Sequence, residues 1–585
     1  MDIFTVTLII SIVVFIAIGN YAGRNVKDLD DYYVAGRRAP TILIVGTLVA
    51  SVFSATIFLG EAGFTYDGQM GPYLLFPGIA GAGYVYGALL FGRYLRRSRA
   101  PTVADYFGQR FNSRRIQQVS GLIIIVALGI YLLVVTQGAA LLLTELTDLS
   151  YHQSLGVAWL SYTFFTLYAG STGVILTDTL MFLLFAVATI AFGVYIVNDL
   201  GGVQAAIEGM TQVEEKRDIA AWHGTVGDDR YWATGWDYLI WAISIDIAWS
   251  VVYAVSPWQA SRHLMARNEH VVLRAAILTC LAIIVLQIFI YGVAGLINIY
   301  NPDIDPSEIV LIWAAQNLVP DILGALLLAG IMAAALSSAS TFLSLVGFSA
   351  SNDILPSDKP LSLSWTRVTV LGVGLVTLAI SLVFPPNIFW LTLFIGTVFT
   401  SSWGPVALMS VWSSRITANG ALWGMITGFV INVVLSALEY AELITLPHYA
   451  NPTIIATSIS LITIIVLSRL GKVTEVERAY REKLHMTPES DKSEAATKLT
   501  LMAPIALIIY GCAIPFVMLH FYVAPYQRGT GQIMESGGIN WATGEAIITL
   551  AAPLLYIPLG LLAYWMIKRD YGRVPSRSAP HQDTK

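Results

Sequence analysis

The sequence predicts an all-α polytopic membrane protein with about fifteen transmembrane helices. Of its 585 residues, 56% are hydrophobic and only 12% are charged, and the mean hydropathy is +0.68. Soluble globular chains carry about 25% charged residues. Apolar segments of about 20 residues, long enough to cross a bilayer as a helix, recur along the whole chain. They lie near residues 3–21, 41–64, 72–92, 117–146, 152–170, 174–199, 236–258, 270–299, 321–350, 366–384, 388–413, 419–437, 452–469, 501–523 and 543–566.

The charges of the short loops predict the orientation. Arg24, Lys27, Arg37 and Arg38 follow the first span, and "GRYLRRSR", "SRHLMARNEHVVLR" and "KRDYGRVPSR" follow the third, the seventh and the last. The alternate loops, such as "YNPDIDPSE", are acidic or nearly uncharged. Because Lys and Arg accumulate on the cytoplasmic side, we expect a multi-pass protein of the plasma membrane. Its N-terminus is expected outside and its C-terminus in the cytoplasm.

Composition and motifs argue against nucleic-acid binding, use of ATP and enzymatic catalysis. The net charge is −5, and the chain contains no GxxxxGK[ST] nucleotide-binding loop. The longest polar segments, 200–235 and 471–499, are too short to be enzyme domains. We therefore expect a membrane carrier that lies in the lipid bilayer, is not an enzyme, and has neither nucleic acid nor a nucleotide as a partner.

The second and seventh expected spans have features of broken helices. The second reads "VGTLVASVFSATIFLGEAG", and the seventh reads "AISIDIAWSVVYAVSPWQ", with Pro257 near its end. The two spans are five helices apart, so they cross the membrane in opposite directions. Transporters built from inverted five-helix repeats place broken helices at such matching positions, where freed carbonyls coordinate cations. The alternative is an ordinary pair of helices, since Gly and Pro are frequent in membrane helices.

The stretch "AALSSASTFLSLVGFSASND" concentrates five hydroxyls, from Ser337, Ser338, Ser340, Thr341 and Ser344, in about two helical turns. Residues at i, i+4 and i+7, such as Ser337, Thr341 and Ser344, share one face of a helix. Neutral hydroxyls bind a dehydrated small cation without burying a further charge. Helix packing through small residues is the alternative, but it accounts poorly for five hydroxyls.

Several segments in this order and spacing resemble the sodium:solute symporter family, which includes proline, pantothenate, acetate, sialic-acid and sodium/glucose cotransporters. The resemblance extends from "YYVAGRR" at 32–38 to "SSRITANGALWG" at 413–424 and covers about three quarters of the chain. Between them lie "YLRRSRAPTVADYFGQRF", "STGVILTDTLMF", "WQASRHLMARNE" and "SSASTFLSLVGFSASNDI". The resemblance implies sodium-coupled symport by alternating access.

The resemblance also implies a LeuT-type 5+5 inverted-repeat core with additional helices at both ends. The expected organisation is an extra helix and loop at 1–39, a ten-helix transport core at 40–415, two further helices at 416–470, a charged cytoplasmic loop at 471–500, two C-terminal helices at 501–570, and a cytoplasmic tail at 571–585.

The family's sodium ligands transfer to this chain residue by residue. The main site is expected from the carbonyls of Ala50, Phe53 and Ala334 and the side chains of Ser337 and Ser338. A possible second sodium site is expected from Asp178, Ser340 and Thr341. Asp178 has an alternative explanation, because an acid at the start of a helix is favoured by the helix dipole.

The solute is predicted to be a short monocarboxylate or another small organic acid. Val52 stands where the sugar and proline branches resemble one another in having a polar side chain, and "IFWLTLFIGTVFTSSWGP" lacks the glutamine of the sugar carriers. The segment "SATIFLGEAGFTYDG" is similar to the acetate and monocarboxylate carriers. Candidate solute-binding residues are Val52, Ser54, Thr56, Gln137, Trp249 and Tyr253.

Three alternatives stay open on the sequence. The chain is also compatible with a sodium symporter of an amino acid such as proline, or of a sugar. A proton-coupled carrier would use Asp178 or Asp246, since acids inside membrane spans usually face a cavity or a partner. A sensor that does not transport is the third alternative. The sequence names no partner for Asp246.

Overall fold

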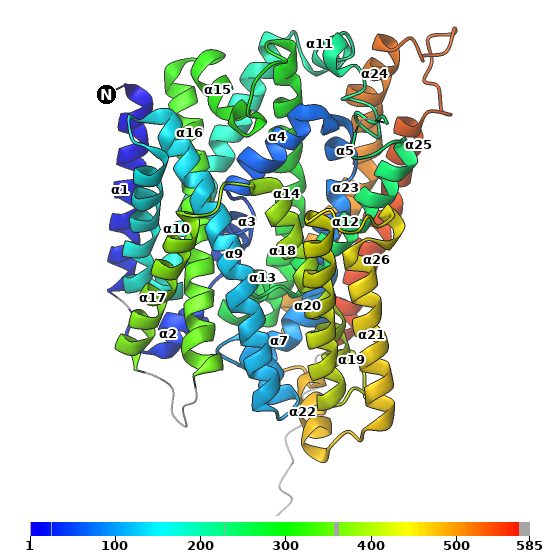
Figure 1. Ribbon diagram of the computed structural model, residues 1–585. Helices are drawn as coiled ribbons and strands as arrows, with labels where there is room; N and C mark the ends of the chain where they lie inside the picture. The colour runs from blue at the N-terminus through cyan, green and yellow to red at the C-terminus, as the bar shows by residue number, and fades with distance from the viewer. Residues whose placement is uncertain (1, 25, 229, 356–361, 573–585) are drawn as a thin grey trace, which may run out of the picture.

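The computed structural model describes residues 2–24, 26–228, 230–355 and 362–572, so most of the predicted tail at 571–585 lies outside the described residues. The described part is helical, without a strand and with one isolated β-bridge between Ala39 and Ala266. Most of the long helices run along a common axis, and their ends form two opposite faces of a bundle (Figure 1). The prediction of an all-α membrane protein is confirmed.

The α-helices have the following bounds: α1 Ile3–Gly23, α2 Leu29–Val34, α3 Thr41–Ala50, α4 Ala62–Phe64, α5 Met70–Leu75, α6 Pro77–Gly87, α7 Arg93–Ser98, α8 Val103–Arg110, α9 Arg114–Leu146, α10 Tyr151–Asp199, α11 Val203–Met210, α12 Gly235–Val255, α13 Pro257–Met265, α14 Glu269–Leu296, α15 Val310–Asn317, α16 Asp321–Phe348, α17 Leu363–Ser381, α18 Ile388–Ser402, α19 Gly404–Trp412, α20 Ala418–Tyr440, α21 Pro452–Leu470, α22 Glu475–His485, α23 Glu494–Met518, α24 Ala524–Gly529, α25 Gly544–Ala551 and α26 Pro553–Tyr571. Short π-helical segments continue several of them: η2 Thr56–Glu61, η3 Thr65–Gln69, η4 Ala88–Gly92, η8 Ser349–Ile354 and η11 Leu519–Val523.

Interruptions of helices explain why fewer continuous spans are found than the fifteen expected. Within the described residues, twelve helices are long and apolar enough to cross a bilayer, and the bent pair Thr56–Leu75 and Pro77–Ser98 adds a thirteenth if it is counted as one span. The helix α3 ends at Ala50 after only 10 residues, which is too short to cross a bilayer. A kink at Gly170 divides the 49 residues of α10 into two arms.

Gly170 reverses the chain direction within α10. Near the start of the first arm, Ser154 accepts a hydrogen bond from Thr144 at the end of α9 (3.0 Å). Directly after the kink, Ser171 donates to the carbonyl of Tyr33, which lies near the other end of the bundle (2.7 Å). The φ angle of Gly170 is 51° with ψ at −152°, a backbone conformation that favours glycine. The two arms therefore cross the bundle in opposite directions.

The loops that the sequence analysis placed on one side of the membrane meet at one end of the bundle. Arg37 donates through Nη2 to the carbonyl of Arg99 (2.9 Å), and Arg96 donates through Nε to the carbonyl of Ala266 (2.5 Å). We call this end the basic face. That the basic face is cytoplasmic stays a prediction.

Two broken helices meet in the middle of the bundle. The first consists of α3 and η2, which are separated by residues 51–55, and the second consists of α12 and α13. Ser256 separates α12 from α13 with an extended backbone (ψ 148°), and Pro257 cannot donate a hydrogen bond to continue the helix. Gln259 donates through Nε2 to Ser51 Oγ (3.2 Å) and so joins the two breaks.

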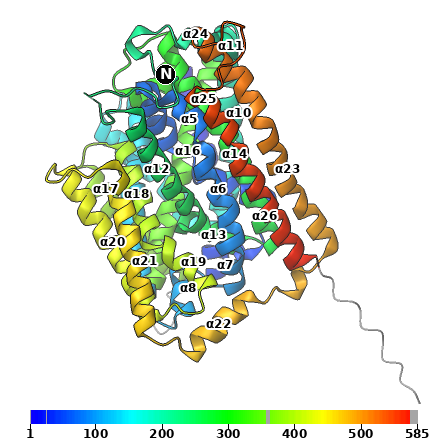
Figure 2. The same ribbon diagram turned by 90° about the vertical axis from the view of Figure 1, so that its right-hand side faces the viewer.

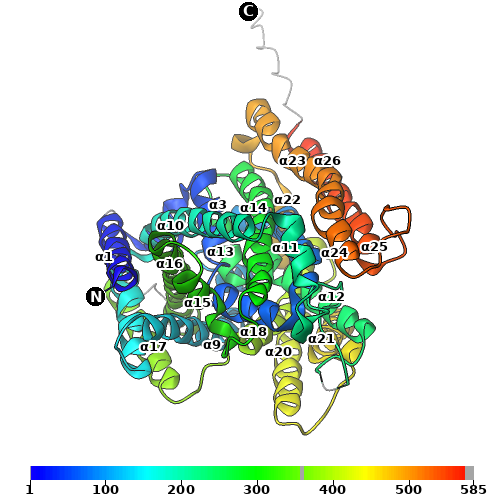
Figure 3. The same ribbon diagram turned by 90° about the horizontal axis from the view of Figure 1, so that it is seen from above.

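The C-terminal helices α23 and α26 form a layer at the edge of the bundle (Figures 2 and 3). They pack against each other, and they also contact α14 and α6, respectively. At the basic face, Arg97 of α7 connects α14 and α22. It pairs with Glu269 of α14 (2.5 Å) and donates to the carbonyl of Leu484 near the end of α22 (2.7 Å). The Tyr571 hydroxyl of α26 donates to the same Glu269. Glu269 is therefore shared by the core and the C-terminal layer, and the ion pair of Arg93 with Asp570 of α26 (2.7 Å) is a second connection between them.

We expect Glu269→Ala to destabilise the protein strongly, because it leaves the guanidinium of Arg97 buried without a counter-charge. Breaking a buried ion pair in this way costs about 3–5 kcal/mol. The matched control is Glu475→Ala, whose pair with Arg478 is largely exposed (side chains 83% and 55% exposed). Exposed pairs contribute at most about 1 kcal/mol. Equal melting temperatures of the two purified variants in detergent would contradict this account.

Candidate functional site

Two serines of α16 lie directly against the carbonyls at the break of the first broken helix. Ser337 Oγ is 3.2 Å from the carbonyl oxygen of Ala50. Ser338 Oγ is 3.4 Å from the carbonyl oxygens of both Ala50 and Phe53. Both carbonyls lie where α3 stops, and no backbone N–H of the described residues is found to donate to either of them. The structure thus brings four of the five expected ligands of the main sodium site into contact.

The fifth expected ligand, Ala334, lies one turn before Ser338 on the same helix and is fully buried. Among the described residues, no group of three or more His, Cys, Asp or Glu side chains is arranged to hold a metal ion. The candidate cation site is therefore built from neutral oxygens. Carbonyl oxygens that replace the hydration shell of an ion are the chemistry by which membrane proteins select alkali cations.

Asp178, on the second arm of α10, is linked to the main site through Ser337. Its Oδ1 accepts a hydrogen bond from Ser337 Oγ (2.7 Å), and its Oδ2 accepts one from Thr47 Oγ1 (2.5 Å). Arg262 Nη2 lies 3.3 Å from the same Oδ2. Asp178 is completely buried, so this paired arrangement satisfies a charge that the membrane interior would otherwise penalise.

Arg262 of α13 is a component of the site that the sequence analysis missed. Its Nη2 donates to Thr341 Oγ1 (2.6 Å), its Nε donates to Thr47 Oγ1 (3.1 Å), and its Nη1 donates to Ser261 Oγ (3.2 Å). The signal in the sequence was an arginine only five residues after Pro257, within "WQASRHLMARNE". The guanidinium therefore lies between Asp178 and Thr341.

The position of Arg262 bears on the expected second sodium site. Asp178 and Thr341 both contact the guanidinium, and Ser340 donates to the carbonyl of Ser337 in its own helix (2.8 Å). Two unit positive charges 4 Å apart repel by about 4 kcal/mol at an effective dielectric constant of 20. A second sodium ion at Asp178, Ser340 and Thr341 stays a prediction, and it requires Arg262 to move away from this arrangement.

A small chamber, which we call the inner chamber, lies beside the helix break. It is narrow, with a cavity volume of about 10 Å³, and is lined by Val52, Thr56, Ile57, Glu61, Tyr131, Trp249, Tyr253 and Trp258. Four of the six expected solute residues are thus brought together. Ser54 hydrogen-bonds to Thr56 at 2.6 Å between their hydroxyl oxygens but does not line the chamber. Gln137 lies apart from it and donates to the carbonyl of Phe384 (2.7 Å).

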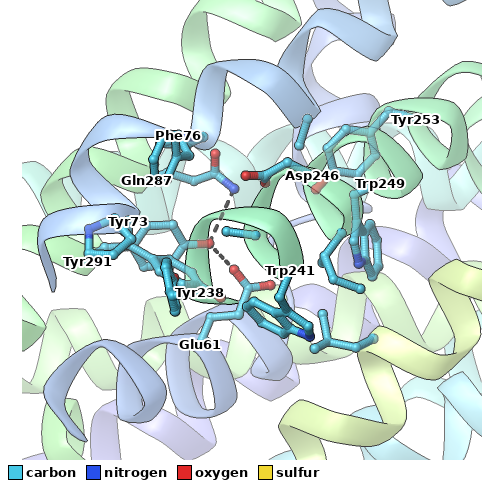
Figure 4. A pocket seen from close by; sticks show the side chains of 16 residues that line it. Glu61, Tyr73, Phe76, Tyr238, Trp241, Asp246, Trp249, Tyr253, Gln287 and Tyr291 are labelled. Carbon is cyan, nitrogen blue, oxygen red and sulfur yellow. Dashed lines mark hydrogen bonds between the residues drawn. The ribbon is translucent and has the colours of Figure 1, made fainter. Parts of the chain in front are cut away.

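The inner chamber contains a carboxylate that the sequence analysis did not assign. Glu61 ends η2 and lines both the inner chamber and a larger cavity of about 70 Å³ next to it. We call the larger one the outer cavity (Figure 4); Asp246 and Gln287 also line it. The signal for Glu61 was an acid inside an apolar span, which usually faces a cavity or a partner.

Comparison with known proteins identifies the family. The model of the sodium:solute symporter family matches residues 32–428. The chain belongs to this family. A sodium/proline symporter of Salmonella typhimurium is 28% identical over 492 residues, which cover 80% of this chain and 93% of the relative. A sodium/pantothenate symporter of Haemophilus influenzae is 26% identical over 436 residues, which cover 72% of this chain and 87% of the relative.

Solved structures of transporters share the fold of this symporter-family member. A Na⁺-coupled sialic acid symporter aligns with a TM-score of 0.68 at 18% identity, covering 81% of this chain and 99% of that structure. Mhp1, a nucleobase-cation-symport-1 family transporter, aligns with a TM-score of 0.51 at 14% identity, covering 77% and 98%. These likenesses concern the fold, and they confirm the predicted LeuT-type fold class. The family consists of sodium-coupled transporters, so the protein is a multi-pass membrane carrier and not an enzyme.

Replacing both Ser337 and Ser338 by Ala should raise the sodium concentration for half-maximal uptake at least about tenfold. The double variant removes two of the five neutral oxygens, and a loss of about 1.4 kcal/mol in binding is a factor of ten. The measurement is solute uptake into proteoliposomes as a function of sodium concentration. Ser344→Ala is the control, because Ser344 is on the same helix but donates to the carbonyl of Ser340 (2.8 Å). Unchanged sodium dependence in a well-folded double variant would refute the site.

Arg262→Gln should impair folding and uptake more than the double variant Arg262→Gln with Asp178→Asn. The single change leaves the buried carboxylate of Asp178 without its cation, whereas the double change removes both charges. The unpaired charge is expected to cost about 3–5 kcal/mol. A double-mutant cycle on melting temperature and sodium-dependent uptake measures the coupling. Additive losses would show that the pair seen at 3.3 Å is not energetically coupled.

Proposed function

We propose that this protein is a plasma-membrane symporter that uses the sodium gradient to import a small organic solute by alternating access. The observation that supports the proposal best is the contact of Ser337 and Ser338 with the carbonyls of Ala50 and Phe53. A sodium ion placed among these oxygens bridges the broken helix and α16. It would therefore favour the conformation in which these two elements are close together.

Coupling between ion and solute follows from the short distance along the chain between the two sites. Val52, which lines the inner chamber, lies in the sequence between Ala50 and Phe53, whose carbonyls are the expected sodium ligands. An ion that orders the break therefore also orders one wall of the solute chamber, and the effect is reciprocal. With the basic face in the cytoplasm, each inward charge contributes about 2.3 kcal/mol per 100 mV of negative-inside potential.

The chemistry of the inner chamber bears on the solute. The break offers donors for a carboxylate next to the chamber, because the backbone N–H groups of Ser54 and Ala55 donate to no acceptor found among the described residues, although neither residue lines the chamber itself. These donors and the apolar Val52 support the predicted short monocarboxylate. The carboxylate of Glu61 in the same chamber would repel a solute whose only charge is negative. A zwitterion carries a carboxylate for the amides and a cation for Glu61, which supports an amino acid as the leading solute class.

Two further observations bear on the alternatives. Curated relatives include sodium/proline symporters, and proline is a zwitterion. Glu61 and Asp246 form no ion pair within the described part of the chain, so a carrier in which one of them binds a proton is the second candidate. Asp178 is a weaker choice for this role, because Arg262 is its counter-charge.

The test is uptake by proteoliposomes with sodium or potassium outside. We expect a sodium gradient to drive the accumulation of proline or a related small zwitterion, with a smaller response to acetate, propionate, lactate and pyruvate and none to glucose. Saturable accumulation of a short acid that excess proline does not reduce would instead establish the monocarboxylate carrier. Uptake that a pH gradient drives equally well without sodium would contradict the proposed coupling ion.

A further inference from the structure

The outer cavity combines two carboxylates with aromatic walls. In Figure 4, Glu61 and Asp246 point into the cavity from two different elements, with Gln287 and Tyr291 to one side and Trp249 and Tyr253 to the other. Asp246 comes from the middle of α12, and Glu61 comes from the end of η2. The cavity is contiguous with the inner chamber, because Glu61, Trp249 and Tyr253 line both.

The two acids have no positively charged partner. No Arg, Lys or His lines the outer cavity in the part of the chain that the structure describes. Glu61 accepts a hydrogen bond from the Tyr291 hydroxyl, which itself accepts one from Gln287 Nε2 (3.2 Å). Asp246 accepts no hydrogen bond found among the described residues. Acids inside a membrane protein are costly and normally face a cavity or a charge partner, so Glu61 and Asp246 are available as counter-charges for a cationic ligand in this cavity.

The aromatic side chains define which cation fits. Tyr73, Tyr238, Trp241, Trp249 and Tyr253 all line the cavity. The rings of Trp249 and Tyr253 lie 5.7 Å apart at an interplanar angle of 59°, and those of Tyr238 and Trp241 lie 5.8 Å apart at 49°. Tilted aromatic faces around a space attract cations through their quadrupoles, and aromatic cages recognise ammonium groups in particular. A bare metal ion would require oxygens in place of most of these rings.

Other ligand classes fit the cavity less well. A free carboxylate would be repelled by Glu61 and Asp246. A neutral polyol would donate hydroxyls to them, but it would leave two acids without a counter-charge in a medium where burying unpaired charge is expensive. A positively charged nitrogen with apolar substituents satisfies both the acids and the rings.

We propose that the outer cavity binds an organic ammonium group of the transported solute, with Glu61 and Asp246 as counter-charges and Trp241, Trp249 and Tyr253 as the cage. The inference rests on the proposed function and narrows it to solutes with a positively charged nitrogen, either simple amines and quaternary ammonium ions or zwitterions. In a zwitterion, the ammonium group lies near Glu61, and the carboxylate extends into the inner chamber toward the helix break.

The experiment is a thermal-shift and uptake screen of the purified protein in sodium chloride with choline, glycine betaine, proline, propionate and glucose as probes. At least one of the three probes with a positively charged nitrogen (choline, glycine betaine and proline) should raise the melting temperature in a saturable way and compete with the others. Glu61→Gln and Asp246→Asn should each weaken that probe about tenfold or more. Asp321→Asn, an exposed acid at the start of α16, is the control and should leave probe binding unchanged.

The sodium-dependent shift in melting temperature separates this inference from the proposed function. Sodium should still stabilise Glu61→Gln and Asp246→Asn, since both residues lie outside the main sodium site, and this also shows that the variants are folded. If a variant does not fold, the test is whether choline, betaine and proline compete with one another for binding to the wild-type protein. Selective binding of propionate or glucose would overturn the ammonium site while leaving sodium symport intact. Unchanged affinity in both folded variants for a probe with a positively charged nitrogen would do the same. Loss of all sodium dependence in the wild-type protein would overturn the proposed function itself.

Discussion

The backbone carbonyls left open by the end of α3 are the constraint on which the rest of the site depends. In a bilayer there is no water to satisfy an interrupted helix, so each freed carbonyl needs another partner. Ala50 and Phe53 find the hydroxyls of Ser337 and Ser338 on α16. These contacts are long, at 3.2–3.4 Å, and weak as hydrogen bonds. A small cation among the same oxygens satisfies them better, which makes the break a natural position for sodium.

A second layer of interactions ties this break to the other broken helix. Arg262 of α13 contacts Thr47 of α3, Asp178 of α10 and Thr341 of α16. Asp178 also contacts the main site, because it accepts a hydrogen bond from Ser337. Four elements, α3, α10, α13 and α16, thus share one buried network of charge and hydroxyl groups. Any change in the position of the guanidinium alters the potential at the sodium site.

The sequence predicts the parts of the site that depend on pattern. The hydroxyl cluster of α16, the interrupted second span and the proline near the end of the seventh are visible as local features, and the structure brings the first two into contact. Helix count is less predictable, because apolarity alone does not reveal where a helix stops inside a span, as at Ala50. The turn at Gly170, in contrast, coincides with the predicted boundary between the spans 152–170 and 174–199. The sodium ligands themselves came from the family resemblance and remain a prediction.

The roles of single polar side chains were the least predictable. Arg262 and Glu61 were visible as charges in or near apolar spans, but their significance depends on neighbours from distant segments, such as Asp178 and Asp246. Gln137 looked equally suitable as a solute donor, yet it donates to the carbonyl of Phe384 instead. Sequence alone does not decide which face of a buried helix meets the solute, since α9 is buried on most sides.

Equilibrium binding of ²²Na⁺ to the purified protein, without solute, tests the central claim most directly. A site of neutral oxygens at the break, with Arg262 beside Asp178 as the fixed cation, predicts saturable binding of one sodium ion per protein that excess potassium does not displace. Absence of saturable binding, or equal competition by potassium, would contradict the site at the break. Two ions per protein with solute absent would contradict the part assigned to Arg262.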